Sequence, residues 1–102
     1  MPRRPENFKA PRDHVIRGDW PEAELHGPPE AVYAQEVARR LRDAIGARSL
    51  KEVAREAGIA DVTVKAILDG KNYTDIRTIA RLEAALGKPL LADWRTRRRT
   101  GG

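Results

Sequence analysis

The sequence lacks several residue types that would point to particular functions. Its 102 residues include no cysteine, which excludes a disulfide framework, thiolate zinc ligands and thiol catalysis. Only Phe8, Trp20, Tyr33, Tyr73 and Trp94 are aromatic, so the core is expected to be mostly aliphatic. No apolar run approaches the length of a membrane span, and no apolar stretch follows the basic N-terminus as in a signal peptide. We therefore expect a protein of the cytoplasm, with no membrane partner.

Proline is also missing from most of the chain. Six of the seven prolines lie in residues 1–29, and none occurs between Pro29 and Pro89. Because proline removes a backbone donor and fixes φ, residues 1–29 are predicted to form an extended, partly ordered arm rather than a regular helix. Val15, Ile16 and Trp20 are expected to lie on the domain that follows.

The positive charge is concentrated at the C-terminus. The net charge is +5, but residues 1–29 carry five basic and five acidic side chains, and residues 30–91 carry eleven and nine. Residues 92–102 carry one acid and a cluster of arginines, namely Arg95, Arg97, Arg98 and Arg99. Such a basic tail attracts nucleic acid electrostatically, or it serves only as a solubilising end.

Helical periodicity dominates residues 30–91. A first helix is predicted over residues 30–46, and Ser49 with Glu52 forms a capping box that opens a second helix through Ala57. A third helix is predicted over residues 61–68, and a fourth starts at Thr74 or Asp75 and ends at Gly87. The residues expected to face inward recur at steps of three and four: Ala34, Val37, Ala38, Leu41 and Ile45; Leu50, Val53, Ala54 and Ala57; Val64, Ile67 and Leu68; Ile76, Ile79, Ala80, Leu82 and Leu86.

No alternating strand pattern of any length is present. The predicted fold is therefore all-α: a compact four- to five-helix bundle with a helix-turn-helix, a proline-rich N-terminal arm and a basic tail. Leu90, Leu91 and Trp94 are expected to add a last short turn.

The second and third predicted helices have the spacing of a helix-turn-helix joint. Two helices that cross steeply need a small residue for close packing and a turn residue that tolerates positive φ. Ala54 is the small residue and Gly58 is the turn. Ile59, Val64 and Ile67 are the expected buried anchors.

These residues resemble a known family. The segments SLKEVAREAGI (residues 49–59), ILDGK (67–71) and IRTIARLEAALG (76–87), with Thr63 and Val64, are similar to the Cro and phage-repressor type of helix-turn-helix. That type belongs to the xenobiotic-response-element family of bacterial and phage transcriptional regulators. The resemblance covers about sixty residues, 30–91. Residues 15–21 also resemble a lead-in of actinobacterial members.

The resemblance implies that the third helix enters the major groove of double-stranded DNA. It also implies a repressor-like protein that is associated with the nucleoid and needs no cofactor. It places base-reading roles on Ala60, Asp61, Val62, Lys65 and Ala66. It places phosphate contacts on Ser49, Lys51, Thr63, Lys71 and Asn72. A homodimer is expected through Leu90, Leu91 and Trp94. Many members have glutamine, serine or asparagine where this chain has Leu50, Asp61 and Val62, so the operator does not follow.

Several residues have two interpretations. Asp61 is predicted mainly as the N-cap of its helix, or as an acceptor for cytosine N4. Lys65 is a donor to guanine or phosphate, or the partner of Asp61 or Asp69 in an ion pair. Val62 meets a thymine methyl group, or is a lightly exposed apolar residue.

Other classes of function are less well supported. His14 and His26 have no acids at ligand spacing, so no metal site is expected. No catalytic motif is present, and we expect no enzyme. The alternative hypothesis is a protein-interaction module, such as an antitoxin-like or adaptor bundle.

Overall fold

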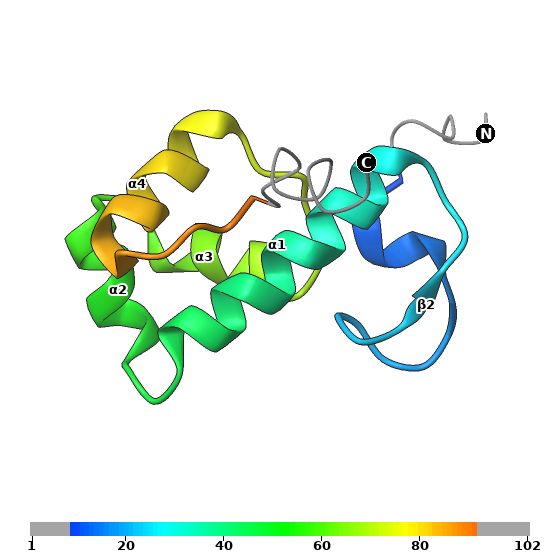
Figure 1. Cartoon of the computed structure of the whole chain (residues 1–102), viewed down its shortest axis with the longest axis horizontal. Coiled ribbons are helices and arrows are strands. Elements are labelled where there is room, and N and C mark those ends of the chain that lie inside the picture. The colour runs from blue at the N-terminus through cyan, green and yellow to red at the C-terminus, as the bar shows by residue number, and fades with distance from the viewer. Residues whose placement is uncertain (1–8, 92–102) are drawn as a thin grey trace, which may run out of the picture.

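The computed structural model describes residues 9–91, and most of them are helical (Figure 1). A 3-10 helix η2 (Pro11–His14) and two short strands, β1 (Val15–Arg17) and β2 (Glu24–Leu25), come first. Four α-helices follow: α1 (Pro29–Ile45), α2 (Leu50–Ala57), α3 (Asp61–Leu68) and α4 (Ile76–Leu86). The prediction of a helical fold is confirmed, but the two-stranded sheet was not predicted.

Helix α1 is the longest element and packs against both α3 and η2. It begins at Pro29, whose missing N–H is harmless in a first turn, and it ends before Gly46. Most of the predicted apolar stripe is buried, and Ala34 is half-buried. Helix α1 therefore supplies one long side of the core.

The start of α2 confirms half of the predicted capping box. Ser49 Oγ accepts a hydrogen bond from the backbone N–H of Glu52 at 3.4 Å. A serine N-cap of this kind contributes about 1 kcal/mol. The Glu52 carboxylate, however, lies 3.4 Å from the guanidinium of Arg48, so its partner is this arginine rather than the backbone of Ser49.

The turn between α2 and α3 has the predicted local geometry. Gly58 adopts a φ of 73°, a left-handed conformation that favours glycine. The N–H of Ile59 donates to the Ala54 carbonyl at 3.0 Å, and Ala54 is buried. From α4, the guanidinium of Arg81 donates to the Gly58 carbonyl at 3.3 Å. Three elements are thereby joined at this turn.

Helix α4 begins at a capping aspartate. Asp75 Oδ1 accepts from the Thr78 N–H at 2.8 Å. Ile79 is buried as predicted, but Ile76 is 79% exposed and Ala80 is also exposed. The prediction was wrong for these two because each lies roughly a quarter turn or more around the helix from the buried stripe.

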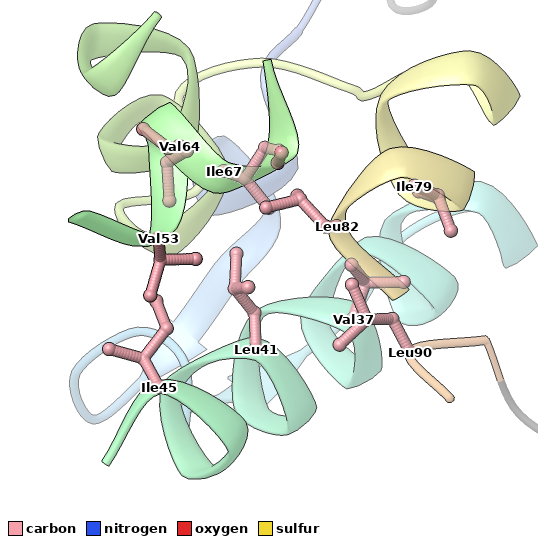
Figure 2. Packing of buried hydrophobic residues seen from close by; sticks show 11 residues of the cluster. Val37, Leu41, Ile45, Val53, Val64, Ile67, Ile79, Leu82 and Leu90 are labelled. Carbon is pink, nitrogen blue, oxygen red and sulfur yellow. The ribbon is translucent and has the colours of Figure 1, made fainter. Parts of the chain in front are cut away.

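The core collects side chains from all four helices (Figure 2). In this view Val37, Leu41 and Ile45 of α1 form one side of the cluster, opposite residues of α2, α3 and α4. The buried cluster comprises Val37, Leu41, Ile45, Val53, Ala54, Ala57, Val64, Ile67, Ile79, Leu82 and Leu90. One small shared core therefore holds the helices together.

The residues after α4 differ from the prediction. Leu90 has no exposed surface and belongs to the core, so its assignment to a dimer patch was wrong. Leu91 is 40% exposed, and Trp94 lies outside the described residues. Residues 88–91 form no helical turn, so the expected last turn is not present within the described part of the chain.

Residues 9–28, here called the N-terminal module, are folded onto the helices. Strands β1 and β2 are antiparallel, with Val15 opposite Leu25 and an irregularity before Arg17. Trp20 is half-buried and reaches the Leu68 carbonyl at the end of α3, as predicted, and Val15 is partly covered. Ile16 is 62% exposed, so the expectation that it lies on the domain was wrong. The predicted extended arm thus contains regular structure.

Candidate nucleic-acid interface

The outer face of α3 is the centre of the candidate interface. Val62, Lys65, Ala66 and Asp69 are spaced at three and four residues, so they share one face of the helix. Val62 is 71% exposed, Lys65 is exposed, and Ala66 is half-buried. The opposite face buries Val64 in the core. Of the five predicted base-reading residues, three lie on this outer face.

The other two predicted reading residues lie at the start of α3. Ala60 is the N-cap and is exposed, and Asp61 is the first helical residue and half-buried. The prediction of Asp61 as the N-cap was therefore wrong by one residue, and the alanine at the N-cap forms no side-chain capping bond. Asp61 instead lies in the first turn, where its carboxylate favourably faces the positive end of the helix dipole.

Lys65 is paired along the helix. Its Nζ lies 3.1 Å from Oδ2 of Asp69, one turn later, while the lysine side chain remains 66% exposed. Such an exposed i,i+4 pair is worth only a few tenths of a kcal/mol. The alternative in which Lys65 pairs with Asp69 is therefore realised. The pair is weak enough that a stronger anion can compete for the lysine. Asp69 was not among the predicted site residues, although its spacing of seven residues from Val62, about two helical turns, indicates the same face of α3.

A hollow adjoins the outer face of α3. It has a volume of about 380 Å³ and lies between α3 and the start of α4. It is lined by Val62, Thr63, Ala66, Ile67, Asn72, Tyr73, Thr74, Asp75 and Thr78. The structure thus brings together Thr63 and Asn72, two of the predicted phosphate ligands, with two of the reading residues. Thr74 and Thr78 also line the hollow, and no sequence pattern predicted this.

Tyr73 marks one wall of this hollow. Partial burial raises the pKa of its phenol, and the nearby Glu30 carboxylate raises it further. A tyrosine hydroxyl is protonated at neutral pH even without this shift, so it can donate a hydrogen bond.

The remaining predicted phosphate ligands are spread over two other places. Ser49 and Lys51 are exposed at the start of α2, and Lys71 is exposed just after α3. None of the three lines the hollow. Arg95, Arg97, Arg98 and Arg99 lie outside the described residues.

A second hollow is more apolar. It has a volume of about 230 Å³ and lies between α1 and the start of α4. Four of its lining residues are large and exposed by 39–79%: Tyr33, Tyr73, Ile76 and Leu91. Exposed apolar clusters of this kind are typical of protein-binding surfaces.

Two features are absent from residues 9–91, a cluster of metal-ligating side chains and a membrane-spanning helix. This part of the chain contains no cluster of three or more histidine and acidic side chains able to hold a metal ion. Within the same range no helix is long and apolar enough to cross a bilayer.

No protein-family model, curated protein or solved structure matches the chain.

Proposed function

We propose that this protein is a sequence-specific DNA-binding transcriptional regulator in which α2 and α3 form a helix-turn-helix. The observation that carries the proposal is the outer face of α3. It presents an exposed valine, a lysine, a small alanine and an aspartate on a helix whose other face is anchored in the core. A face built in this way lets a helix approach another surface closely.

The dimensions of α3 suit the major groove. An α-helix with its side chains has a diameter of about 10–12 Å. The major groove of B-DNA is about 12 Å wide and admits one α-helix. Lys65 has the long donor side chain needed to reach guanine O6 or N7, and Val62 is placed to contact a thymine methyl group.

Binding requires Lys65 to change partner. In the free protein Lys65 pairs with Asp69, and in the complex its ammonium group turns to a base or a phosphate. The exchange costs little because the ion pair is solvent-exposed. Asp61 at the reading end of α3 accepts from cytosine N4 or remains with its own helix end.

Phosphate contacts hold the helix in position. Thr63 and Asn72 line the hollow beside α3, and Lys71 lies three residues after its end, so docking of α3 in the groove would bring these side chains toward the flanking phosphates. Ser49 and Lys51 supply a second anchor from the start of α2. The arginines of residues 95–99 add sequence-independent attraction.

The family and the oligomeric state belong to the same proposal. The segments that resemble the xenobiotic-response-element regulators are those that form α2, the glycine turn, α3 and α4. A homodimer would place two α3 helices about 34 Å apart, on one face of the duplex. Leu91 and Trp94 remain the predicted dimer residues, without Leu90.

Binding to mixed genomic DNA at two salt concentrations tests the proposal. The protein is expected to bind at about 50 mM salt and to weaken steeply by about 200 mM, because bound phosphates release counterions. A chain lacking residues 95–102 serves as the control, and it should keep part of this binding. Absence of binding at the lower salt concentration would rule the proposal out.

The second candidate is a protein-interaction module, which the apolar hollow between α1 and α4 favours. In that case Ile76, at 79% exposure, is a contact residue for another protein. Replacement of Ile76 by glutamate separates the two functions: it abolishes partner binding in the second case and leaves DNA binding intact in the first.

A further inference from the structure

The N-terminal module is attached to the C-terminal end of α3. The backbone N–H of Arg12 donates to the Gly70 carbonyl at 3.0 Å. The indole Nε1 of Trp20 donates to the Leu68 carbonyl, also at 3.0 Å. Leu68 is the last residue of α3, where helix carbonyls lack intrahelical partners, and Gly70 lies two residues beyond it. Trp20 lies 48 positions and Arg12 58 positions before its acceptor, so residues distant in the chain satisfy the end of this helix.

Gly70 is shaped for this attachment. Its φ is 69°, and a Cβ atom built on it would lie 2.5 Å from Cε2 of Trp20. Any other residue would displace the indole ring from this place. The tryptophan therefore lies directly against the turn that follows α3.

The module is also held by α1. Arg39 Nε donates to the Pro21 carbonyl at 3.0 Å, and Gln35 donates to the Ala23 carbonyl. Arg42 forms an ion pair with Glu22. Because contacts reach both α1 and α3, the module keeps a fixed position relative to the outer face of α3.

This arrangement brings the backbone of one cationic residue next to that of another. Arg12 is bonded through its backbone to Gly70, the neighbour of Lys71, and both side chains are exposed. The nearby carboxylates are already engaged: Asp13 accepts from the Ala10 N–H at 2.9 Å, and Asp69 pairs with Lys65. Across residues 9–91, neither Arg12 nor Lys71 takes part in an ion pair with a described residue.

We propose that Arg12 and Lys71 form a phosphate-binding edge, through which the N-terminal module extends the DNA contact from α3 to the flanking backbone. This inference rests on the proposed DNA-binding function. Guanidinium and ammonium groups are the side chains that bind phosphate oxygens best, and the arginine can do so with two parallel hydrogen bonds. A contact of this type adds affinity without reading sequence.

Replacement of Arg12 by alanine tests the role of the side chain without disturbing the fold. The bond to Gly70 uses the backbone N–H of residue 12, so Arg12→Ala preserves the attachment of the module. Lys88→Ala is the matched control. Lys88 is an exposed cation in the segment that follows α4, and Figure 1 shows α4 and β2 at opposite ends of the molecule.

The measurement is affinity for a long duplex of selected sequence over a series of salt concentrations. Arg12→Ala and Lys71→Ala are each expected to reduce the slope of log K against log salt by about 0.9. Each substitution should lower the affinity for specific and for non-specific duplexes by the same factor. Arg12→Lys should restore the slope, and Lys88→Ala should not change it. The thermal unfolding midpoint of Arg12→Ala should match that of the wild type.

A second readout uses duplex length. The wild type should gain affinity when the duplex is extended by several base pairs beyond the site. The double variant Arg12→Ala/Lys71→Ala should bind the longer and the shorter duplex equally. If Arg12→Ala keeps the wild-type slope while Lys65→Ala weakens binding, the interface ends at α3 and this proposal is wrong. If the wild type binds no duplex, the proposed function fails and this edge fails with it.

Discussion

The outer faces of α1 and α3 carry charge in different ways. On α1, Arg39 and Arg40 both pair with Glu36, and Arg42 pairs with Asp43 and with Glu22 of the N-terminal module. On α3, one ion pair joins Lys65 to Asp69, beside the exposed valine and the half-buried alanine.

The difference separates a covered surface from an open one. Long side chains that neutralise one another on α1 satisfy their charges within the molecule and keep other surfaces at a distance. Short side chains on α3 leave its backbone accessible. We therefore expect mutations on α3 to affect binding and equivalent mutations on α1 to affect stability slightly.

Ala66→Glu should have the largest effect. A longer anionic side chain on the outer face of α3 would both block close approach and repel phosphates. We expect DNA affinity to fall by about 100-fold or more, since the loss of contacts worth 1–3 kcal/mol adds to charge repulsion. Equilibrium binding measures this loss. Ala84→Glu, at an exposed site on α4, should bind like the wild type; equal losses in both variants would show that net charge, rather than α3, is responsible.

Lys65→Ala and Arg40→Ala compare two cations that each have a partner one turn away along their helix. Lys65→Ala should weaken DNA binding roughly tenfold, as expected for one lost base or phosphate contact of about 1–3 kcal/mol. Arg40→Ala should leave binding unchanged and cost about 1 kcal/mol of stability or less. Binding isotherms and urea unfolding of both variants measure these effects.

The partner of Lys65 sharpens this comparison. Asp69→Asn removes the competing carboxylate and should raise affinity a few-fold, whereas Glu36→Gln on α1 should not. Reduced affinity in Asp69→Asn would mean that the ion pair itself is part of the binding surface.

Asp75 gives the smallest effect and concerns stability alone. The Thr78 hydroxyl and N–H groups hold the pKa of the Asp75 carboxyl below its ordinary value of 3.8. A lowered folded-state pKa contributes stability that is present above the unfolded pKa and is lost as pH falls through the folded pKa. Asp75→Ala should therefore lower the thermal unfolding midpoint by a few degrees at pH 7.

The pH dependence checks the cause of this effect. The difference between Asp75→Ala and the wild type should shrink as pH falls below about 3.8, where the carboxyl begins to protonate. Asp75→Asn keeps a capping acceptor that does not titrate. Its thermal unfolding midpoint at pH 7 should therefore lie closer to that of the wild type than the midpoint of Asp75→Ala does. A constant difference between wild type and Asp75→Ala over the whole range would exclude the capping bond as its source.

Sequence patterns predicted the helices well because local signals marked their ends. Ser49, Gly58 and Gly87 are found at the expected helix ends, and the apolar stripe of α1 is buried. Asp61 was misplaced by one position because the true N-cap, Ala60, has no side chain that signals a cap.

The N-terminal module was harder to predict. Its strands have three and two residues, too few for an alternating pattern. Its attachment depends on Trp20 reaching the Leu68 carbonyl 48 residues later, a contact that no local pattern encodes. Likewise, Leu90 is apolar in either role, and only the packed core distinguishes burial from a dimer contact.

Selection of genomic fragments by the wild-type protein and by Ala66→Glu tests the central claim, that α3 reads DNA, most directly. The account predicts that fragments bound by the wild type share a sequence motif, and that the variant enriches none. It would be contradicted if the wild type enriched no motif, or if the variant enriched the same one.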